Sequence, residues 1–296
     1  MQIGRRGLFF YPDGLSSREM IAFARRLEAL GYSALWLPEV GGRDPFVAAA
    51  RILDHTETLV VATGIANLYA RDPMAMKAAQ YALAEQSGGR FLLGVGVSHK
   101  PLVEDLRGHA YGPPLAAMQA FLDGHEAAAY GAVAPAERPP MLLAALGPKM
   151  LALARERADG AHPYMVTPEH TQAARQTLGP DKLLCVEHKV LLEPDRAKAR
   201  AIARANPSLS VGLTLPNYRR SLVRQGFEAA DFAGGPSDRL VDALVASGDA
   251  AAIEARLHEH EAAGADHVCL HPLHPEAKSE PWWPSIEALA PVRGRG

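Results

Sequence analysis

A glycine, a proline and a lysine follow an apolar stretch in a pattern that suits anion binding. Residues 141–145 are typical of a strand, and Leu146, Gly147, Pro148 and Lys149 come directly after them. Pro148 suits the first position of a helix, where free amides attract a phosphate, and Gly147 lets that phosphate approach the backbone. Lys149 would add a positive charge. An ordinary strand-to-helix turn with a solvated lysine fits the same residues.

Two titratable residues at the ends of other predicted strands could move protons. Glu39 follows the buried-looking segment Trp36-Leu37-Pro38, and His99 follows residues 91–98. A carboxylate or an imidazole acts as general acid or base when it comes within about 3 Å of the proton that moves. Glu39 could equally accept a hydrogen bond or form an ordinary ion pair at the rim of the fold.

The third predicted strand, residues 59–65, contains a glycine close to its end. Thr63, Gly64 and Ile65 lead there into Ala66 and Asn67. A glycine inside a strand often marks a bulge or the close approach of a ligand, although a simple twist of the strand is an equally good interpretation. This segment is therefore a second candidate binding element.

Other catalytic patterns receive little support. No His-Glu-x-x-His or Gly-x-Ser-x-Gly sequence occurs, and His99 replaces the third glycine of a dinucleotide fingerprint after Gly94 and Gly96. We therefore predict no metal site and no acyl-transfer triad. Cys185 and Cys269 lie within apolar runs, which indicates core thiols in a reducing compartment rather than a disulfide.

Composition narrows the classes of partner. The 296 residues include 31 Lys and Arg and 33 Asp and Glu, for a formal net charge of −2. That balance argues against a nucleic-acid protein and against a polybasic membrane-surface protein. The least polar stretch, residues 59–70, is too short to cross a bilayer, and no signal peptide is evident at the N-terminus. We predict a soluble, cytoplasmic protein.

Strand-like and helix-like segments alternate along the whole chain. Helix starts are marked by Ser16, Asp44, Asp72 and Thr167, three of them followed by proline. The predicted strands are residues 8–11, 34–37, 59–65, 91–95, 141–145, 161–166, 183–192 and 267–270. Eight strands, each followed by a helix, predict a (β/α)8 TIM barrel, with an open doubly wound sheet as the alternative.

We treat residues 1–296 as a single barrel domain. Residues 193–266 are too long for one crossover, so we expect extra helices between strands seven and eight, starting near Asp195, Ser237 and Asp249. Because functional groups of a barrel gather at the carboxyl ends of its strands, the segments named above should meet at one face.

Several of these segments, in this order, resemble the luciferase-like monooxygenase superfamily, and more closely its branch of F420-dependent oxidoreductases. The resemblance covers nearly the whole chain, and the ordered set is more specific than any one segment. The matching segments are residues 30–39, 62–67, 71–73, 89–99, 145–151, 158–164 and 263–268.

The resemblance implies a TIM barrel, usually a homodimer, that holds a flavin or deazaflavin at its carboxyl face. Gly64-Ile65 matches a bulge, often with a cis peptide, that supports the ring, and Glu39 matches a position near the polar edge of the ring. The segment Leu146–Lys149 matches the phosphate-binding loop. The resemblance thus nominates as cofactor-binding Glu39, Thr63, Gly64, Ile65, Asn67, Val97, Ser98, Leu146, Gly147, Pro148, Lys149, His162, Pro163 and Tyr164.

One position departs from the family pattern. Many relatives carry histidine directly after the acidic residue of strand two, and this chain has Val40. We therefore predict Glu39 or His99 as the catalytic proton-handling residue. The expected activity is hydride transfer between coenzyme F420 and a small organic substrate. The alternatives are an FMN-dependent monooxygenase and a non-catalytic deazaflavin-binding protein.

The segment Asn217–Arg220 is expected to cover the mouth of the barrel. Arg219 and Arg220 within it could contact an acidic cofactor tail, although a solvated helix face explains these two residues better.

Overall fold

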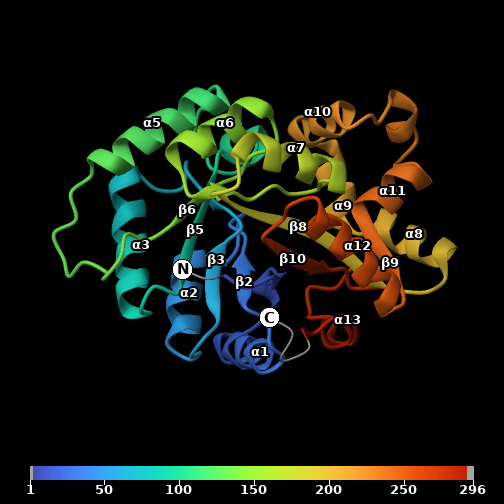
Figure 1. Cartoon of the computed structure of the whole chain (residues 1–296), viewed down its shortest axis with the longest axis horizontal. Helices are drawn as coiled ribbons and strands as arrows, with labels where there is room; N and C mark the ends of the chain where they lie inside the picture. Colours follow the sequence, from blue (N-terminus) through green and yellow to red (C-terminus); the bar gives the residue numbers. More distant parts are fainter. Residues whose placement is uncertain (1–2, 292–296) are drawn as a thin grey trace.

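Eight parallel strands form a closed barrel at the centre of the molecule in the computed structural model, which describes residues 3–291 (Figure 1). The ends of the predicted domain, residues 1–2 and 292–296, lie outside the described residues. The barrel strands are β1 (Arg6–Phe9), β2 (Ala34–Leu37), β3 (Val60–Thr63), β5 (Phe91–Gly96), β6 (Met141–Leu143), β7 (Gly160–Ala161), β8 (Leu183–Leu192) and β10 (His267–Pro272). β10 closes the barrel because it pairs with both β1 and β8. The predicted TIM barrel is confirmed.

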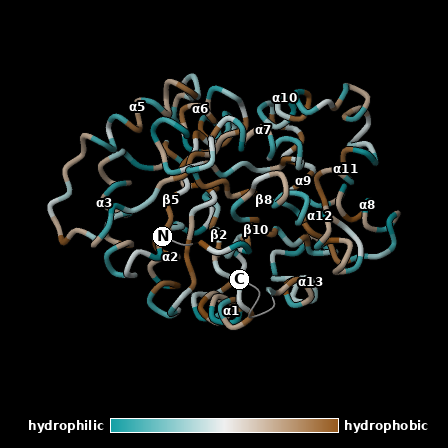
Figure 2. Tube along the Cα trace, viewed as in Figure 1, coloured by the Kyte–Doolittle hydropathy of each residue, from teal (hydrophilic) through white to brown (hydrophobic). Residues whose placement is uncertain are grey.

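Helices surround the barrel and bury one face each against it. They are α1 (Ser17–Ala29), α2 (Pro45–Leu53), α3 (Pro73–Gln86), α5 (Pro114–Ala127), α6 (Pro148–Arg157), α7 (Pro168–Leu178) and α12 (Ala250–Ala262). Strands at the centre are mostly hydrophobic, whereas the helices alternate between polar and apolar residues (Figure 2). This pattern is what a helix with one buried stripe produces.

The predicted helix starts are confirmed by their capping hydrogen bonds. Ser16 and Glu19 form a reciprocal capping box at the start of α1. Asp44, Asp72 and Thr167 cap α2, α3 and α7, each directly before a proline at the first helical position. These local signals place the helices, and thereby the strand ends between them.

Two main sets of buried side chains can be distinguished. One packs the strands against the surrounding helices, and a separate one lies inside the barrel. It includes Phe9, Trp36, Cys185 and Cys269. Both cysteines are free and buried, which confirms them as core residues. Trp36 Nε1 donates a 3.0 Å hydrogen bond to His267 Nε2, so the interior also holds polar groups that need partners.

The chain between β8 and β10 forms an extension beside the barrel (Figure 1, gold to orange). It contains α8 (Arg196–Ala205), α9 (Pro207–Ser210), the 3-10 turns η2 (Gly212–Thr214) and η3 (Ala229–Phe232), α10 (Pro216–Arg224), α11 (Asp238–Leu244) and β9 (Val245–Gly248). The extra helices were predicted, and Asp195, Ser237 and Asp249 cap α8, α11 and α12 as expected. β9 was missed, because its short sequence lacks the pattern of a strand; it pairs with the last residues of β8.

A few further bounds differ from prediction. The third strand stops at Thr63 and resumes as β4 (Ala66–Asn67), so residues 59–65 are not one continuous strand. Of the predicted strand 161–166, only Ala161 belongs to a strand, β7, which begins one residue earlier at Gly160. The elements η1 (Pro12–Gly14), α4 (Lys100–Glu104) and α13 (Trp283–Ala288) are further short helices. Within residues 3–291 no helix has the length and apolar character needed to cross a membrane. The cytoplasmic location stays a prediction.

Candidate functional site

The strand break after β3 is a bulge with a cis peptide bond between Gly64 and Ile65, as the family resemblance implied. Thr63 Oγ1 donates a 2.7 Å hydrogen bond to Gly94 O, and Gly94 N donates a 2.9 Å bond back to Thr63 Oγ1. After the bulge, β4 pairs again with the end of β5. The hydroxyl of Thr63 therefore replaces backbone pairing where the strand leaves the sheet.

The bulge rests on two aromatic side chains of the barrel interior. A Cβ atom on Gly64 would lie 2.9 Å from the Phe9 ring and 3.2 Å from His162 Nε2. His162 Nδ1 donates a 2.8 Å hydrogen bond to Cys185 O, and its ring stacks on Trp36 with centroids 4.3 Å apart. Burial lowers the pKa of His162 to about 4, so the ring is neutral at pH 7. Gly64 is required here by the close approach.

His162 Nε2 is a polar atom left unused beside the bulge. It is buried and has no hydrogen-bond partner among the described residues. Buried polar atoms normally find a partner, and an exception marks a strained or functional position. The neighbouring Pro163 is also buried, and its carbonyl accepts a 3.1 Å bond from Glu187 N.

Glu39 lies at the carboxyl end of β2, but its carboxylate is already engaged. Arg71 donates bonds of 2.9 and 2.6 Å to its two oxygens, and Asn67 N donates a third of 2.7 Å. Arg71 also contacts Asp44 Oδ2 at 3.0 Å. Three hydrogen bonds from two partners hold a carboxylate in one orientation. Glu39 therefore fixes β4 relative to β2.

His99 lies beyond the end of β5, after the half-buried residues Val97 and Ser98. Its Nδ1 lies 3.1 Å from Asn217 Oδ1 of α10 and donates to it, and its ring is 5.2 Å from that of Tyr218. Burial lowers the pKa of His99, so the imidazole is neutral at pH 7. His99 thus connects the barrel mouth to the extension.

The turn predicted to bind an anion lies at the start of α6, as expected, and a further cation, Arg224, lies beside it. Gly147 is the N-cap of α6 and offers no side chain to the free amides of the first turn. A Cβ on Gly147 would lie 3.7 Å from Arg224 Nη2 of α10, and the same nitrogen donates a 3.4 Å bond to Leu146 O. Lys149 and Pro148 are exposed. A phosphate here would meet backbone amides and two cations.

Helix α10 crosses the mouth between these segments. Asn217 contacts His99, the ring of Tyr218 lies 5.7 Å from that of Tyr164, and Arg224 reaches Leu146 O. The expected covering of the mouth is thus present. Arg219 and Arg220 are exposed, and Arg219 packs its guanidinium 4.8 Å from the Phe232 ring. The solvated-face interpretation of these two arginines is therefore the better one.

A buried charged cluster beneath Tyr164 was not predicted as part of the site. Glu187 Oε1 accepts bonds of 2.9 Å from both Lys189 Nζ and His271 Nδ1, and Glu187 Oε2 accepts a 3.1 Å bond from Met165 N. Burial alone would raise the pKa of Glu187, but the Lys189 charge and these hydrogen bonds hold it far below its usual range. Strand alternation was the available signal, because Cys185, Glu187 and Lys189 share one face of β8.

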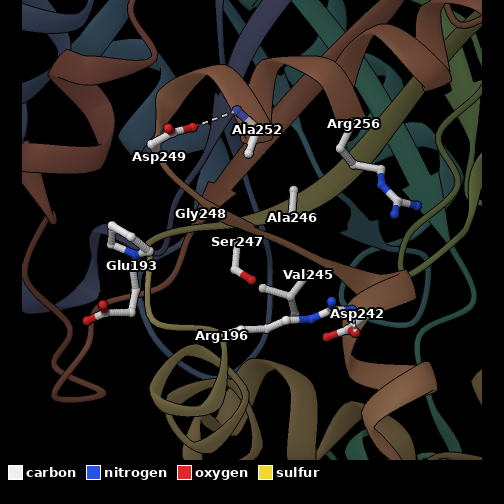
Figure 3. A pocket seen from close by; sticks show the side chains of 11 residues that line it. Glu193, Arg196, Asp242, Val245, Ala246, Ser247, Gly248, Asp249, Ala252 and Arg256 are labelled. Carbon is white, nitrogen blue, oxygen red and sulfur yellow. Dashed lines mark hydrogen bonds and ion pairs between the residues drawn. The ribbon is translucent and has the colours of Figure 1, made fainter.

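Two pockets formed by the described residues lie at the edges of this arrangement. One of about 430 Å³ opens between β9, α8 and α12, but its charges are already used: Arg196 pairs with Asp242 at 2.6 Å, and Asp249 caps α12 (Figure 3). Another, of about 420 Å³, opens beside Glu39 and Arg71, with Val40 on its rim. Residues 3–291 contain no group of three or more His, Cys, Asp or Glu side chains placed to hold a metal ion.

The chain is thus a parallel TIM barrel with a cis bulge after β3 and, after β6, a helix whose first amides have no side-chain cap. The sequence matches the luciferase-like monooxygenase family over residues 9–267. The chain belongs to this family, and the predicted class of enzyme is confirmed.

Several individual proteins that resemble this chain are named for coenzyme F420 or for a pterin substrate. A Mycobacterium tuberculosis protein named as a coenzyme F420-dependent oxidoreductase is 27% identical over 83% of this chain and 87% of its own length. The 5,10-methylenetetrahydromethanopterin reductase of Archaeoglobus fulgidus is 25% identical over 92% of this chain and 95% of its own. An F420-dependent secondary alcohol dehydrogenase has the same fold, with a TM-score of 0.77, 14% identity and 97% of each chain covered.

Proposed function

We propose that this protein is an oxidoreductase that transfers hydride between coenzyme F420 and a small organic substrate. The observation that carries the proposal is the pairing of the Gly64–Ile65 bulge with the anion-binding turn at Gly147 on the same face of the barrel. Names of the relatives support F420 as the cofactor. A deazaflavin supplies the hydride chemistry, and the protein supplies binding, orientation and exclusion of water.

The residues present fit such a cofactor. Gly64, Ile65 and Asn67 would support the ring, with His162 Nε2 as a polar atom free to meet it. Val97, Ser98, Pro163 and Tyr164 would form the walls. The phosphate would lie against Leu146, Gly147, Pro148 and Lys149, with Arg224 as a further cation. Helix α10 would cover the bound cofactor from the extension.

The proton-handling roles of Glu39 and His99 stay predictions. In the structure, both side chains already form hydrogen bonds with other residues. Glu39 is bound by Arg71 and by Asn67 N. His99 is bound by Asn217. In the proposed function Glu39 holds the ring support in place, and His99 holds α10 over the mouth.

Equilibrium binding tests the proposed cofactor. We expect F420 to bind the purified apoprotein with a Kd of about 1–100 µM, the ordinary range for enzyme ligands, and FMN to bind at least about tenfold more weakly. The two cofactors have different visible spectra, so absorbance titration reports each separately. Tighter binding of FMN would favour the monooxygenase alternative, and absence of binding by both would refute the proposal.

The name of the family supports the FMN-dependent monooxygenase as the second candidate. A non-catalytic deazaflavin carrier is the third. It would bind F420 in the same titration but would not return electrons from reduced F420 to any organic acceptor. Reoxidation of bound, reduced F420 by a panel of organic acceptors of different classes therefore separates the carrier from the enzyme.

We also propose a homodimer formed through α2 and α3, which pack side by side. Val47 near the start of α2 is 61% exposed, and Met74 at the start of α3 is 59% exposed. Large exposed apolar side chains on neighbouring elements are typical of an interaction surface.

Light scattering tests the dimer. The double change Val47→Glu and Met74→Glu should convert the dimer to a monomer, because two carboxylates on each copy would be buried without partners. Val133→Glu is the matched control, since Val133 is 73% exposed and lies in the loop before β6. A wild-type mass of one chain, or a dimer that survives the double change, would contradict the proposal.

A further inference from the structure

The charged cluster inside the barrel, formed by Glu187, Lys189 and His271, is almost completely shielded from solvent. The side chains of Lys189 and Glu187 are 0% and 1% exposed, and that of His271 is 8% exposed. Taking such ions out of water costs several kcal/mol per ion, and the pair recovers this only with good geometry. A buried ion pair is therefore weak evidence for stability, and its place in the fold has to be explained in another way.

Tyr164 lies directly above the cluster. Lys189 Nζ is 4.0 Å from the centre of the Tyr164 ring, and the Tyr164 hydroxyl is 3.4 Å from His271 Nδ1. Tyr11, which is partly exposed, lies on the same side, with its ring 5.6 Å from that of Phe9 and 6.1 Å from that of His271. One face of the Tyr164 ring thus meets the Lys189 ammonium, and its hydroxyl lies beside the His271 ring.

The same tyrosine reaches the candidate site. Its ring is 5.4 Å from that of Phe9, the side chain on which the Gly64 bulge rests, and 5.7 Å from that of Tyr218 in α10. Tyr164 therefore lies between the ring support below and the covering helix above. This is the space in which a substrate stacked on a flat cofactor would meet the protein.

We propose that Tyr164 is the proton donor of the reaction. A hydride delivered to carbon and a phenolic proton delivered to oxygen together reduce a C=O bond, so this pair of donors serves carbonyl compounds and the corresponding alcohols. This inference rests on the proposed function. Lys189, Glu187 and His271 are positioning residues, because they act through Tyr164 rather than on the substrate.

The step balances with reduced F420 as the reductant. Hydride, with its electron pair, forms a C–H bond at the carbonyl carbon, the C=O π pair moves onto oxygen, and that oxygen takes the proton of the Tyr164 hydroxyl. The carbonyl compound is reduced to an alcohol and the deazaflavin is oxidised. The tyrosinate then regains a proton from solvent, because the Tyr164 side chain is itself only partly buried.

Each neighbour of Tyr164 has a defined part in this step. Lys189 places a positive charge against the ring, where it stabilises the negative charge that develops as the proton leaves. Glu187 fixes Lys189 and His271 by one hydrogen bond each. Burial, with the nearby Glu187 charge, raises the pKa of Tyr164 well above 10, so the hydroxyl carries its proton at pH 7. Both oxygens of Glu39 are already bound by Arg71, so Glu39 is not free to turn toward a substrate.

Steady-state kinetics with reduced F420 and a panel of small ketones and aldehydes, acetone included, tests the role. Tyr164→Phe should lower kcat by about 10²–10⁴-fold at little changed KM, the usual effect of losing a general acid. Its F420 affinity should stay within about threefold of wild type, since no charge is lost. Tyr81→Phe, a hydroxyl removed on α3 away from the mouth, is the matched control.

The outcomes separate this inference from the proposed function. Failure of F420 to bind wild type refutes the proposed function. Binding without reoxidation by any carbonyl compound refutes the substrate class. Turnover that survives Tyr164→Phe but is lost in His99→Gln overturns Tyr164 as the donor and assigns the proton to His99.

A second measurement needs neither cofactor nor turnover. In apoprotein labelled with [13Cζ]tyrosine, the Tyr164 resonance, assigned by its loss in Tyr164→Phe, reports the environment of the phenol. We expect it to shift in His271→Gln and in the double variant Glu187→Gln, Lys189→Met, while the Tyr81 resonance does not move. An unchanged Tyr164 resonance in these folded variants would show that the cluster does not act on Tyr164.

Discussion

Replacing Lys189 with methionine is expected to lower the free energy of unfolding by about 3–5 kcal/mol. Lys189 Nζ is the charged partner of Glu187 at 2.9 Å, and neither side chain reaches solvent. Methionine has a similar volume, so packing changes little, and the main consequence is a carboxylate buried without its cation. Urea unfolding followed by circular dichroism gives the difference, with the slope of the transition checked for two-state behaviour.

The double variant Glu187→Gln, Lys189→Met is the control for this prediction. It removes both charges, so it should recover most of the lost stability, because replacing a whole buried pair is often close to neutral. Met165 N can still donate to the glutamine oxygen, and His271 Nδ1 can accept from the glutamine NH2 group if the imidazole takes its other tautomer. Equal losses in the single and the double variant would mean that methionine disturbs packing, and that the Lys189 charge contributes little.

The cluster shows which part of the site local sequence patterns do not reveal. Glu187 and Lys189 alternate with Val186 and His188 in an apolar strand, and that alternation separates the two faces of β8 without saying which of them faces the barrel interior. Charged residues in strands usually face solvent, so the pattern alone favours the wrong side. His271 joins the pair because β10 lies beside β8, with His271 opposite Lys189, and this neighbour relation follows only from closure of the barrel.

Elements marked by local chemistry were predicted accurately. The strand 183–192 has its predicted bounds, and Ser16, Asp44, Asp72 and Thr167 cap helices because each side chain satisfies backbone amides within three residues. The cis bulge at Gly64 was implied by family resemblance, since glycine in a strand is equally consistent with a twist. β9 was missed because only its pairing with β8 makes four small or polar residues a strand.

The sequence also does not reveal which arginine of α10 lies next to the turn at Gly147; in the structure it is Arg224. It approaches the anion-binding turn from α10, and its contact with Leu146 O spans 78 residues of sequence. Arg219 and Arg220 on the same helix were the basic residues considered earlier, but they point to solvent. Helical periodicity can place three arginines on one helix, whereas the packing of that helix across the mouth decides which of them meets the turn.

The geometry around Arg224 leads to the prediction for Gly147. Gly147→Val is expected to weaken F420 binding by about 10–150-fold, which corresponds to loss of about 1.5–3 kcal/mol of charge-assisted hydrogen bonding. A Cβ at Gly147 would point toward Arg224 Nη2 at 3.7 Å, so the branched side chain would fill the space between the free amides of α6 and the guanidinium. Fluorescence titration of F420 into each apoprotein measures the change.

This substitution should act on binding alone. Gly147 has φ −104° and ψ 156°, an extended conformation that valine adopts readily, and 3.7 Å is an ordinary contact distance. The thermal midpoint should therefore match that of Gly131→Val, a control in open space before β6. Arg224→Leu should weaken F420 binding in the same direction without blocking the amides. If both Gly147→Val and Arg224→Leu bind F420 as wild type does, the phosphate lies elsewhere and the anion-binding turn has no part in the site.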